Sequence, residues 1–127
     1  GVTITVNSLT ELKDGENTII LNDLQGDHVR VRGRVSGTSS VIATRIELRS
    51  PDVDVDLQGL VQSIAGDVIV ILGVPVDIGT INHFESVSGT STSRAAFLAA
   101  VNVGTLVKVK GPLNGTVVTW DEAELED

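Results

Sequence analysis

Apolar and polar residues alternate along most of this chain, which is the pattern of β-strands with one buried face. Residues 2–6 alternate Val and Ile with Thr, and residues 29–35 alternate Val and Gly with Arg. Residues 74–78 alternate again, with Pro75 indicating an edge position. Residues 68–72 are continuously apolar, as in a strand that is buried on both faces or curled into a barrel. The chain is therefore predicted to consist mainly of strands.

Turn residues divide these strands. Gly-Thr-Ser-Ser at 37–40 predicts a hairpin between 29–35 and 41–49, and Asn114-Gly115 predicts another between 106–113 and 116–125. Ala65-Gly66-Asp67 predicts a tight turn, and Gly59 predicts a bulge or bend in a strand over 54–64. The sequence thus predicts strands joined by short turns.

Helical signals are few. Ser93 followed by residues 94–101 predicts a capped helix. The polar segment 10–27 contains the turn signal Asp14-Gly15, and its apolar patch at 19–21 predicts a helical turn or an irregular bridge. Residues 86–93, rich in Ser, Thr and Gly, predict an exposed loop.

The sequence contains an internal repeat. Residues 26–33, Gly-Asp-His-Val-Arg-Val-Arg-Gly, return as residues 104–111, Gly-Thr-Leu-Val-Lys-Val-Lys-Gly. Each copy leads into a second apolar run, at 41–48 or at 118–125. Repetition at this scale predicts two related structural units.

The fold class predicted is all-β with one short helix. Residues 54–127 read strand, strand, strand, helix, strand, strand, the order of an OB-like five-stranded Greek-key barrel. Residues 1–50 fit the same template from its third to fifth strands only, as a partial repeat. Missing two strands, this partial unit is expected to join the sheet of the second unit or to pair with another chain through an open sheet edge, as in a homo-oligomer.

Composition supports a globular domain with an aliphatic core. The 127 residues are 41% hydrophobic with a mean hydropathy of +0.23, but only three are aromatic. The net charge of −8 opposes general binding to nucleic acid. There is no Cys for disulfides or thiol chemistry, and no run long enough for a membrane span. Because it lacks Met and starts Gly1-Val2, the chain is expected to be a piece of a longer protein.

A row of three arginines is the candidate binding site for a polyanion or an oligosaccharide. Arg30, Arg32 and Arg34 alternate on one predicted strand face, where guanidinium groups can hold phosphates or an acidic glycan. The alternative is that these charges form cross-strand ion pairs. In the first copy the arginines would pair with Glu47, and in the second copy Lys108 and Lys110 would pair with Glu122, Glu124 and Glu126.

Two further sites carry both a functional and a structural interpretation. Asp52, Asp54 and Asp56 offer oxygen ligands to calcium. Alternate residues on a strand lie about 7 Å apart, which is too far for all three to bind one ion without a loop. The alternative interpretation is an edge strand whose charges protect it against unwanted pairing. Trp120 offers a stacking surface for a sugar or a base, or else packs half-buried in the core.

The two histidines show no catalytic spacing. His28 is expected in a surface turn and His83 at a rim, and no Gly-x-Ser-x-Gly motif accompanies them. A hydrolase would need His28 or His83 in a pocket beside an acid and a nucleophile. We therefore expect no enzymatic activity and no cofactor.

Several short motifs follow one another along the chain: Gly-x-x-Val-x-Val-x-Gly, then Ala-Thr-Arg-Ile-Glu at 43–47, Leu-Gln-Gly-Leu-Val at 57–61 and Gly-Val-Pro-Val-Asp at 73–77. With these motifs the sequence resembles a bacterial family of tandem small β-barrel domains of unknown function. At Trp120-Asp121-Glu122 the second copy departs from the first. The resemblance implies an exported protein, periplasmic or a lipoprotein of the outer membrane, with no assigned activity. We accordingly expect a non-enzymatic binding or structural module located outside the cytoplasm.

Overall fold

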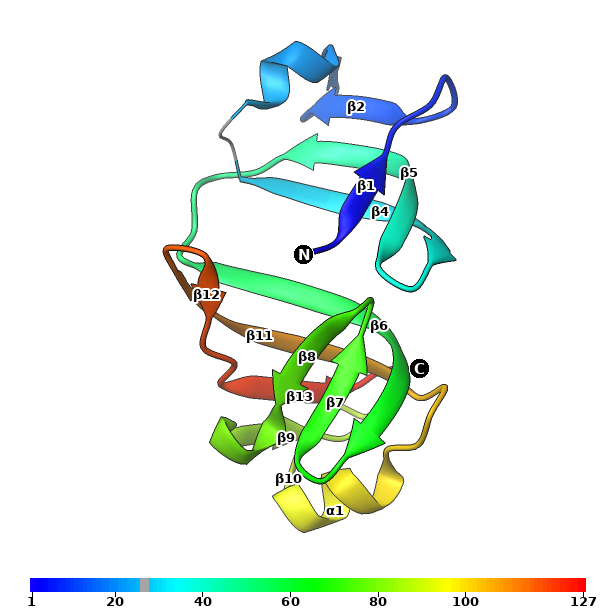
Figure 1. Ribbon diagram of the computed structural model, residues 1–127. Helices are drawn as coiled ribbons and strands as arrows, with labels where there is room; N and C mark the ends of the chain where they lie inside the picture. The colour runs from blue at the N-terminus through cyan, green and yellow to red at the C-terminus, as the bar shows by residue number, and fades with distance from the viewer. Residues whose placement is uncertain (26–27) are drawn as a thin grey trace. The chain divides into compact units, whose positions relative to one another are not determined.

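The computed structural model describes residues 1–25 and 28–127 (Figure 1). Gly26 and Asp27, which begin the first copy of the repeat, lie outside the described residues. The chain is mostly β-structure, as predicted, and it divides into two compact units, Gly1–Asp52 and Val53–Asp127. Each unit has its own sheet, and whether the first unit completes its sheet with the second unit or with another chain stays a prediction.

The first unit is built around β5. This strand pairs in parallel with β1 and β2 and antiparallel with β4, while β3 pairs with β2 (Figure 1). The elements of this unit are β1 (Thr3–Thr5), β2 (Glu11–Asp14), β3 (Asn17–Thr18), the 3-10 turn η1 (Leu21–Leu24), β4 (Val29–Gly37) and β5 (Ser40–Leu48).

The turn signals of the first unit place its hairpins correctly. The predicted hairpin of β4 and β5 forms around residues 37–40, and the Asp14-Gly15 signal joins β2 to β3, with Gly15 at φ 61°. The short strands β2 and β3 themselves were not predicted. Only two to four residues long, they show too little alternation to be recognised in the sequence.

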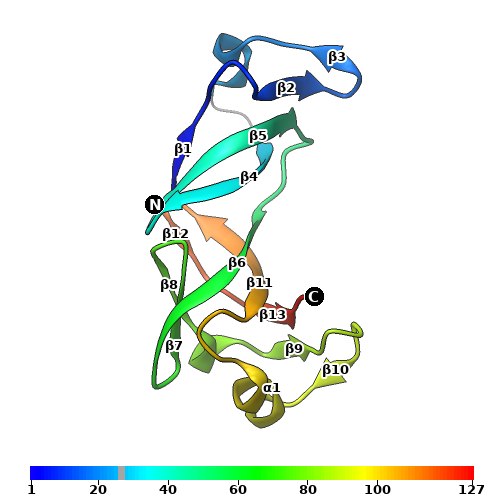
Figure 2. The same ribbon diagram turned by 90° about the vertical axis from the view of Figure 1, so that its right-hand side faces the viewer.

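The second unit has an eight-stranded sheet ordered β10-β9-β13-β11-β6-β7-β8, with β12 paired to β11 (Figure 2). Its central strand β11 pairs antiparallel with β6 on one side and β13 on the other, and β13 pairs in parallel with β9. The elements are β6 (Asp54–Ala65), β7 (Val68–Ile71), β8 (Val74–Asp77), η2 (Ile78–Thr80), β9 (His83–Glu85), β10 (Ser91–Thr92), α1 (Arg94–Ala100), β11 (Leu106–Asn114), β12 (Val117–Val118) and β13 (Glu122–Leu125).

Several local predictions for the second unit are confirmed. Helix α1 is capped by the Ser93 hydroxyl, which accepts a hydrogen bond from the Ala96 backbone N–H at 3.1 Å. The turn at Asn114-Gly115 joins β11 to β12, and Pro75 lies on β8, which ends the strand order. The 86–93 segment is mostly exposed, although Ser91 and Thr92 pair with β9 as β10.

Two local predictions are wrong in part. The register shift in β6 lies between Val61 and Ser63, so the bulge is not at Gly59, and a bend there stays a prediction. Gly59 is buried, and a Cβ atom on it would lie 2.9 Å from the Ile71 Cγ2 atom. Strand β7 is not buried on both faces, since its Ile residues are buried and its Val residues half-buried; its alternative interpretation as a strand curled into a barrel stays a prediction.

The two units differ in the completeness of their cores. Among the described residues of the first unit, the buried apolar ones are Val41, Ala43 and Ile46, and all three belong to β5. The second buries a large apolar set around Phe97, whose ring lies 5.0 Å from that of Phe84. The second unit thus has a core in which helix α1 packs on β9, and the first unit has a small core centred on β5.

The repeat holds at the level of strand pairing. Gly33 of β4 and Gly111 of β11 occupy the same position of the repeat. A Cβ atom on Gly33 would collide with the Ile42 carbonyl oxygen of β5, and one on Gly111 with the Thr119 carbonyl oxygen in the segment between β12 and β13. The Leu12–Ile46 pair of β2 and β5 likewise corresponds to the parallel Phe84–Ala123 pair of β9 and β13. The units are therefore related in structure; their assignment as a partial and a complete OB-like barrel stays a prediction.

Candidate functional site

The three candidate arginines lie where the sequence places them. Arg30, Arg32 and Arg34 alternate along β4, and all three are exposed. Across the hairpin, Arg30 lies opposite Glu47 and Arg32 lies opposite Arg45. The strand thus presents three guanidinium groups on one outer face.

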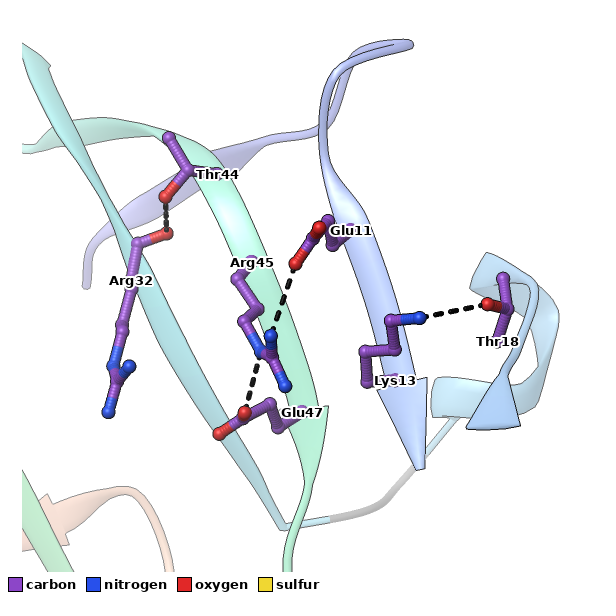
Figure 3. Close-up of polar contacts among 7 residues, drawn as sticks. All are labelled: Glu11, Lys13, Thr18, Arg32, Thr44, Arg45 and Glu47. Atoms are coloured by element: carbon purple, nitrogen blue, oxygen red, sulfur yellow. Dashed lines mark hydrogen bonds and ion pairs between the residues drawn. The ribbon is translucent and has the colours of Figure 1, made fainter. Parts of the chain in front are cut away.

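Arg45 of β5 forms ion pairs with two carboxylates, those of Glu47 and Glu11. Its Nε donates to Glu47 Oε1 at 2.6 Å, and its Nη1 donates to Glu11 Oε2 at 3.2 Å (Figure 3). Desolvation acts to raise the pKa of Glu47. The hydrogen bond from Arg45 and the charges of Arg45, Arg32 and Arg30 together outweigh it and hold this pKa below its ordinary value. Glu47 is therefore an ionised partner of Arg45.

Among the residues that the structure describes, the three arginines of β4 consequently have no carboxylate of their own. Within the described residues, none of their guanidinium groups lies within ion-pair distance of an Asp or Glu. Arg32 shows this in Figure 3, where its only marked contact is its backbone carbonyl, which accepts from the Thr44 hydroxyl at 3.2 Å. The predicted pairing of the Arg row with Glu47 is thus replaced by the Arg45–Glu47 pair.

In the second unit the lysines of the equivalent strand are paired. Lys108 Nζ donates to Glu124 Oε2 at 3.0 Å and lies 3.9 Å from Glu126 Oε1. The hydrogen bond to Glu124 is the main cause that raises the pKa of Lys108, against the effect of desolvation. Lys110 lies 3.7 Å from Asp54 Oδ2 on the neighbouring strand, where the sequence predicted one of the C-terminal glutamates. Cross-strand ion pairing therefore describes β11, whereas β4 keeps free cations.

The predicted calcium ligands are not gathered into a cluster. In the part of the chain that the structure describes, Asp52, Asp54 and Asp56 do not come within ligand distance of one another as a group of three. Asp54 lies beside Lys110, and Asp56 is exposed on β6. Strand β7 pairs only with the Val61–Ala65 half of β6, whereas the half that carries Asp54 and Asp56 pairs with β11. Among the described residues this half of β6 therefore has a partner strand on one side only, which fits the edge-protection interpretation.

A different group forms around His83. Donor atoms of His83, Glu85 and Glu122 all lie within 4.8 Å of one another. His83 Nε2 lies 2.8 Å from Glu85 Oε1, and this hydrogen bond is the main cause that raises the pKa of His83, although burial opposes it. The sequence alone does not indicate this group, because Glu122 comes to lie beside His83 only through the parallel pairing of β9 with β13. The His-x-Glu spacing on one strand was the available signal.

The remaining candidate residues do not form a site. The Trp120 side chain is 9% exposed, so the packing interpretation holds and it presents little surface for stacking. His28 is half-buried at the start of β4, and its carbonyl accepts the Arg49 N–H at 2.9 Å. No helix of the described chain is long and apolar enough to span a membrane.

Comparison with known proteins gives one result. A family model described as a domain of unknown function (DUF5666) matches residues 1–47 and 58–119. The two matched segments correspond to the two copies of the repeat. No curated protein and no solved structure matches the chain.

Proposed function

The chain belongs to the family described as a domain of unknown function (DUF5666), and we propose its function from the geometry of its strands. The chain acts as a non-enzymatic binding module in which β4 pairs with an extended acidic strand of a partner. The module is expected to act through main-chain pairing at a sheet edge, with specificity from the arginine row. This mode of recognition is strand addition.

The observation that carries the proposal is the one-sided pairing of β4. Among the described residues, β4 pairs only with β5, whereas its counterpart β11 pairs with β13 and also with β6. Residues of β4 are exposed along most of its length, while those of β11 are largely buried or half-buried. A nine-residue strand with a free edge is a template for another chain.

The pairing of β6 with β11 indicates the chemistry of the partner. There Lys110 lies opposite Asp56, and Pro112 lies opposite Asp54. Carried onto β4 by the repeat, the same register places carboxylates opposite Arg32 and Arg34. Opposite charges directly across a strand pair stabilise it, and like charges destabilise it. A partner strand with carboxylates at alternate positions therefore fits β4.

A peptide copy of β6 tests the proposal. The peptide comprises residues 52–60, Asp-Val-Asp-Val-Asp-Leu-Gln-Gly-Leu, and its control carries Asn in place of the three Asp. We expect saturable binding of the acidic peptide to the full chain, weakened by salt, with slower hydrogen exchange at β4 amides. The charge-reversed protein R32E/R34E should lose binding, whereas R49E should keep it.

Absence of binding to β4, or equal binding of the acidic and Asn peptides, would contradict the proposal. Light scattering coupled to size exclusion, at low and moderate salt, measures whether a second copy of the chain supplies the strand. In an antiparallel β4 pair the arginines of the two copies face one another, so self-association through this edge is expected to strengthen as salt rises.

A polyanion such as an acidic glycan is the second candidate ligand, because three unpaired guanidinium groups lie on one face. A heparin fragment is the probe. It should shift the arginine side-chain NMR signals and bind more weakly as salt rises, without slowing exchange at β4 amides. Amide protection thus distinguishes this candidate from strand addition.

Two parts of the proposal have separate support. The non-enzymatic role is supported by the sequence, in which no Gly-x-Ser-x-Gly motif accompanies His28 or His83. The extracytoplasmic location comes from the resemblance of the sequence to an exported family. Fractionation of cells that produce the natural protein tests the location.

A further inference from the structure

The group of His83, Glu85 and Glu122 lies on a face that the fold holds rigid. His83 and Glu85 flank Phe84 on β9, and Phe84 is buried against Phe97. Because side chains alternate along a strand, anchoring Phe84 turns both flanking residues outward. Glu122 starts β13 directly beside His83, and the backbone N–H of His83 donates to the Asp121 carbonyl at 3.2 Å.

The cations around this group are already engaged elsewhere. Lys108 binds Glu124, and Lys110, which lies opposite Glu122, is next to Asp54. Glu122 forms no ion pair with any described residue. Glu122 thus adds a second carboxylate beside the His83–Glu85 pair, and no described Lys or Arg forms an ion pair with it.

At the corresponding position of the first unit, the chain itself supplies a cation, Arg45. Glu11 and Arg45 lie opposite each other there, as His83 and Glu122 do in the second unit. Arg45 binds Glu11 at 3.2 Å and Glu47 at 2.6 Å (Figure 3). Where the first copy has a guanidinium between two carboxylates, the second copy has the carboxylate of Glu122.

We propose that His83, Glu85 and Glu122 bind one divalent transition-metal ion, with Zn²⁺ as the probe. One imidazole nitrogen and two carboxylate oxygens suit zinc and its neighbours in the first transition series, while Ca²⁺ and Mg²⁺ prefer oxygen ligands alone. Ligand atoms around one tetrahedral zinc lie about 3.3 Å apart, as follows from bonds of about 2 Å. The present separations of up to 4.8 Å close to this value by side-chain rotation.

The partly exposed surroundings fit a site open to solvent. The side chains of His83 and Glu85 are 47% and 24% exposed, and Glu122 is half-buried. Three protein ligands leave a fourth position for water or for a donor from a partner. Binding replaces the His83–Glu85 hydrogen bond by two bonds to the metal.

Calorimetric titration of the full chain with Zn²⁺ tests the site, with backbone and imidazole NMR signals recorded in parallel. We expect one ion per chain, and shifts of the His83 imidazole signal but not of the His28 signal. The H83N, E85Q and E122R variants should each bind at least about tenfold more weakly. E122R places in the second unit the residue that the first unit has at this position.

Matched controls separate this site from the acidic surface. H28N and E124Q alter a histidine and a carboxylate outside the group and should keep the affinity of the unaltered chain. Equal weakening by H28N or E124Q, unchanged affinity in all three site variants, or no saturable binding up to about 1 mM Zn²⁺ would overturn the inference. So would Ca²⁺ binding of equal affinity, since that would indicate carboxylates alone.

Discussion

Residue 45 in the first unit, and its counterpart residue 122 in the second, decide the charge of the neighbouring strands. Arg45 neutralises Glu11 and Glu47 and so leaves the arginines of β4 unpaired. In the second unit Lys108 forms an ion pair with Glu124, and Glu122 adds a carboxylate beside His83. The difference at this one position thus contributes to a basic outer face in the first unit and an acidic one in the second.

Replacing Arg45 with Gln should raise the pKa of Glu47 toward its ordinary value, because the hydrogen bond and the nearest charge are lost. The pair stabilises the folded state above the ordinary pKa of a glutamate, and this contribution disappears as pH falls through the lowered pKa. NMR titration of the Glu47 carboxyl carbon measures the change. An unaltered midpoint in R45Q would show that Arg45 does not hold Glu47.

Gly33 and Gly111 are required by contacts with the neighbouring strand. Gly111→Ala should destabilise the second unit by about 1–3 kcal/mol, because the new methyl group meets the Thr119 carbonyl. Gly33→Ala should disturb the first unit only. Denaturation and amide spectra of both variants measure this, with Gly1→Ala as control since nothing lies within 4 Å of Gly1. Wild-type stability in Gly111→Ala would contradict the close approach.

At the scale of elements, the unpaired edge of β4 distinguishes the two sheets. Strand β11 pairs with β6 and β13, whereas in the part of the chain that the structure describes β4 pairs with β5 alone. Two strands with nearly the same sequence pattern therefore have different surroundings. The pattern predicts both strands, but their neighbours depend on which other strands each unit contains.

Helix α1 depends on its first turn, since it has only seven residues and short helices are marginal without tertiary contacts. Ser93→Ala should lower the stability of the second unit by about 1 kcal/mol, through loss of the bond from Ala96 N–H to the Ser93 hydroxyl. Thermal denaturation measures the effect, and Ser91→Ala, on the exposed β10, serves as the control. Equal stability of the two variants would argue against the cap.

At the scale of the whole molecule, the charge and the core are divided unequally. The first unit has six Lys and Arg against seven Asp and Glu, and the second has three against ten. Most of the net charge of −8 therefore belongs to the second unit, which also contains most of the buried apolar residues. A basic strand can thus exist within an acidic chain.

The difference between the cores predicts how fragments behave. Residues 53–127 should unfold cooperatively by themselves, whereas residues 1–52, which bury only three apolar side chains, should not form a stable fold alone. Circular dichroism and thermal scans of the two fragments measure this. A cooperative transition in the fragment 1–52 would show that its small core suffices.

The sequence by itself determined the local structure, because alternation and turn chemistry act over a few residues. It predicted the all-β class, the β4–β5 hairpin, the turn at Asn114-Gly115 and the capped helix, and it identified the row of arginines. It also contained the repeat, which the strand pairing reproduces at Gly33 and Gly111. It did not predict β2 and β3, which are too short for a periodic signal.

Only the tertiary structure decided which charges meet. Parallel pairing of β9 with β13 joins Glu122 to His83, and the pairing of β2 with β5 joins Glu11 to Arg45, across separations in sequence that no local pattern encodes. Burial likewise assigned Trp120 to the core, because its exposure depends on strands far away in the chain. Ion pairs and metal ligands depend on distances of a few ångströms between strands, and these distances exist only once the sheet has formed.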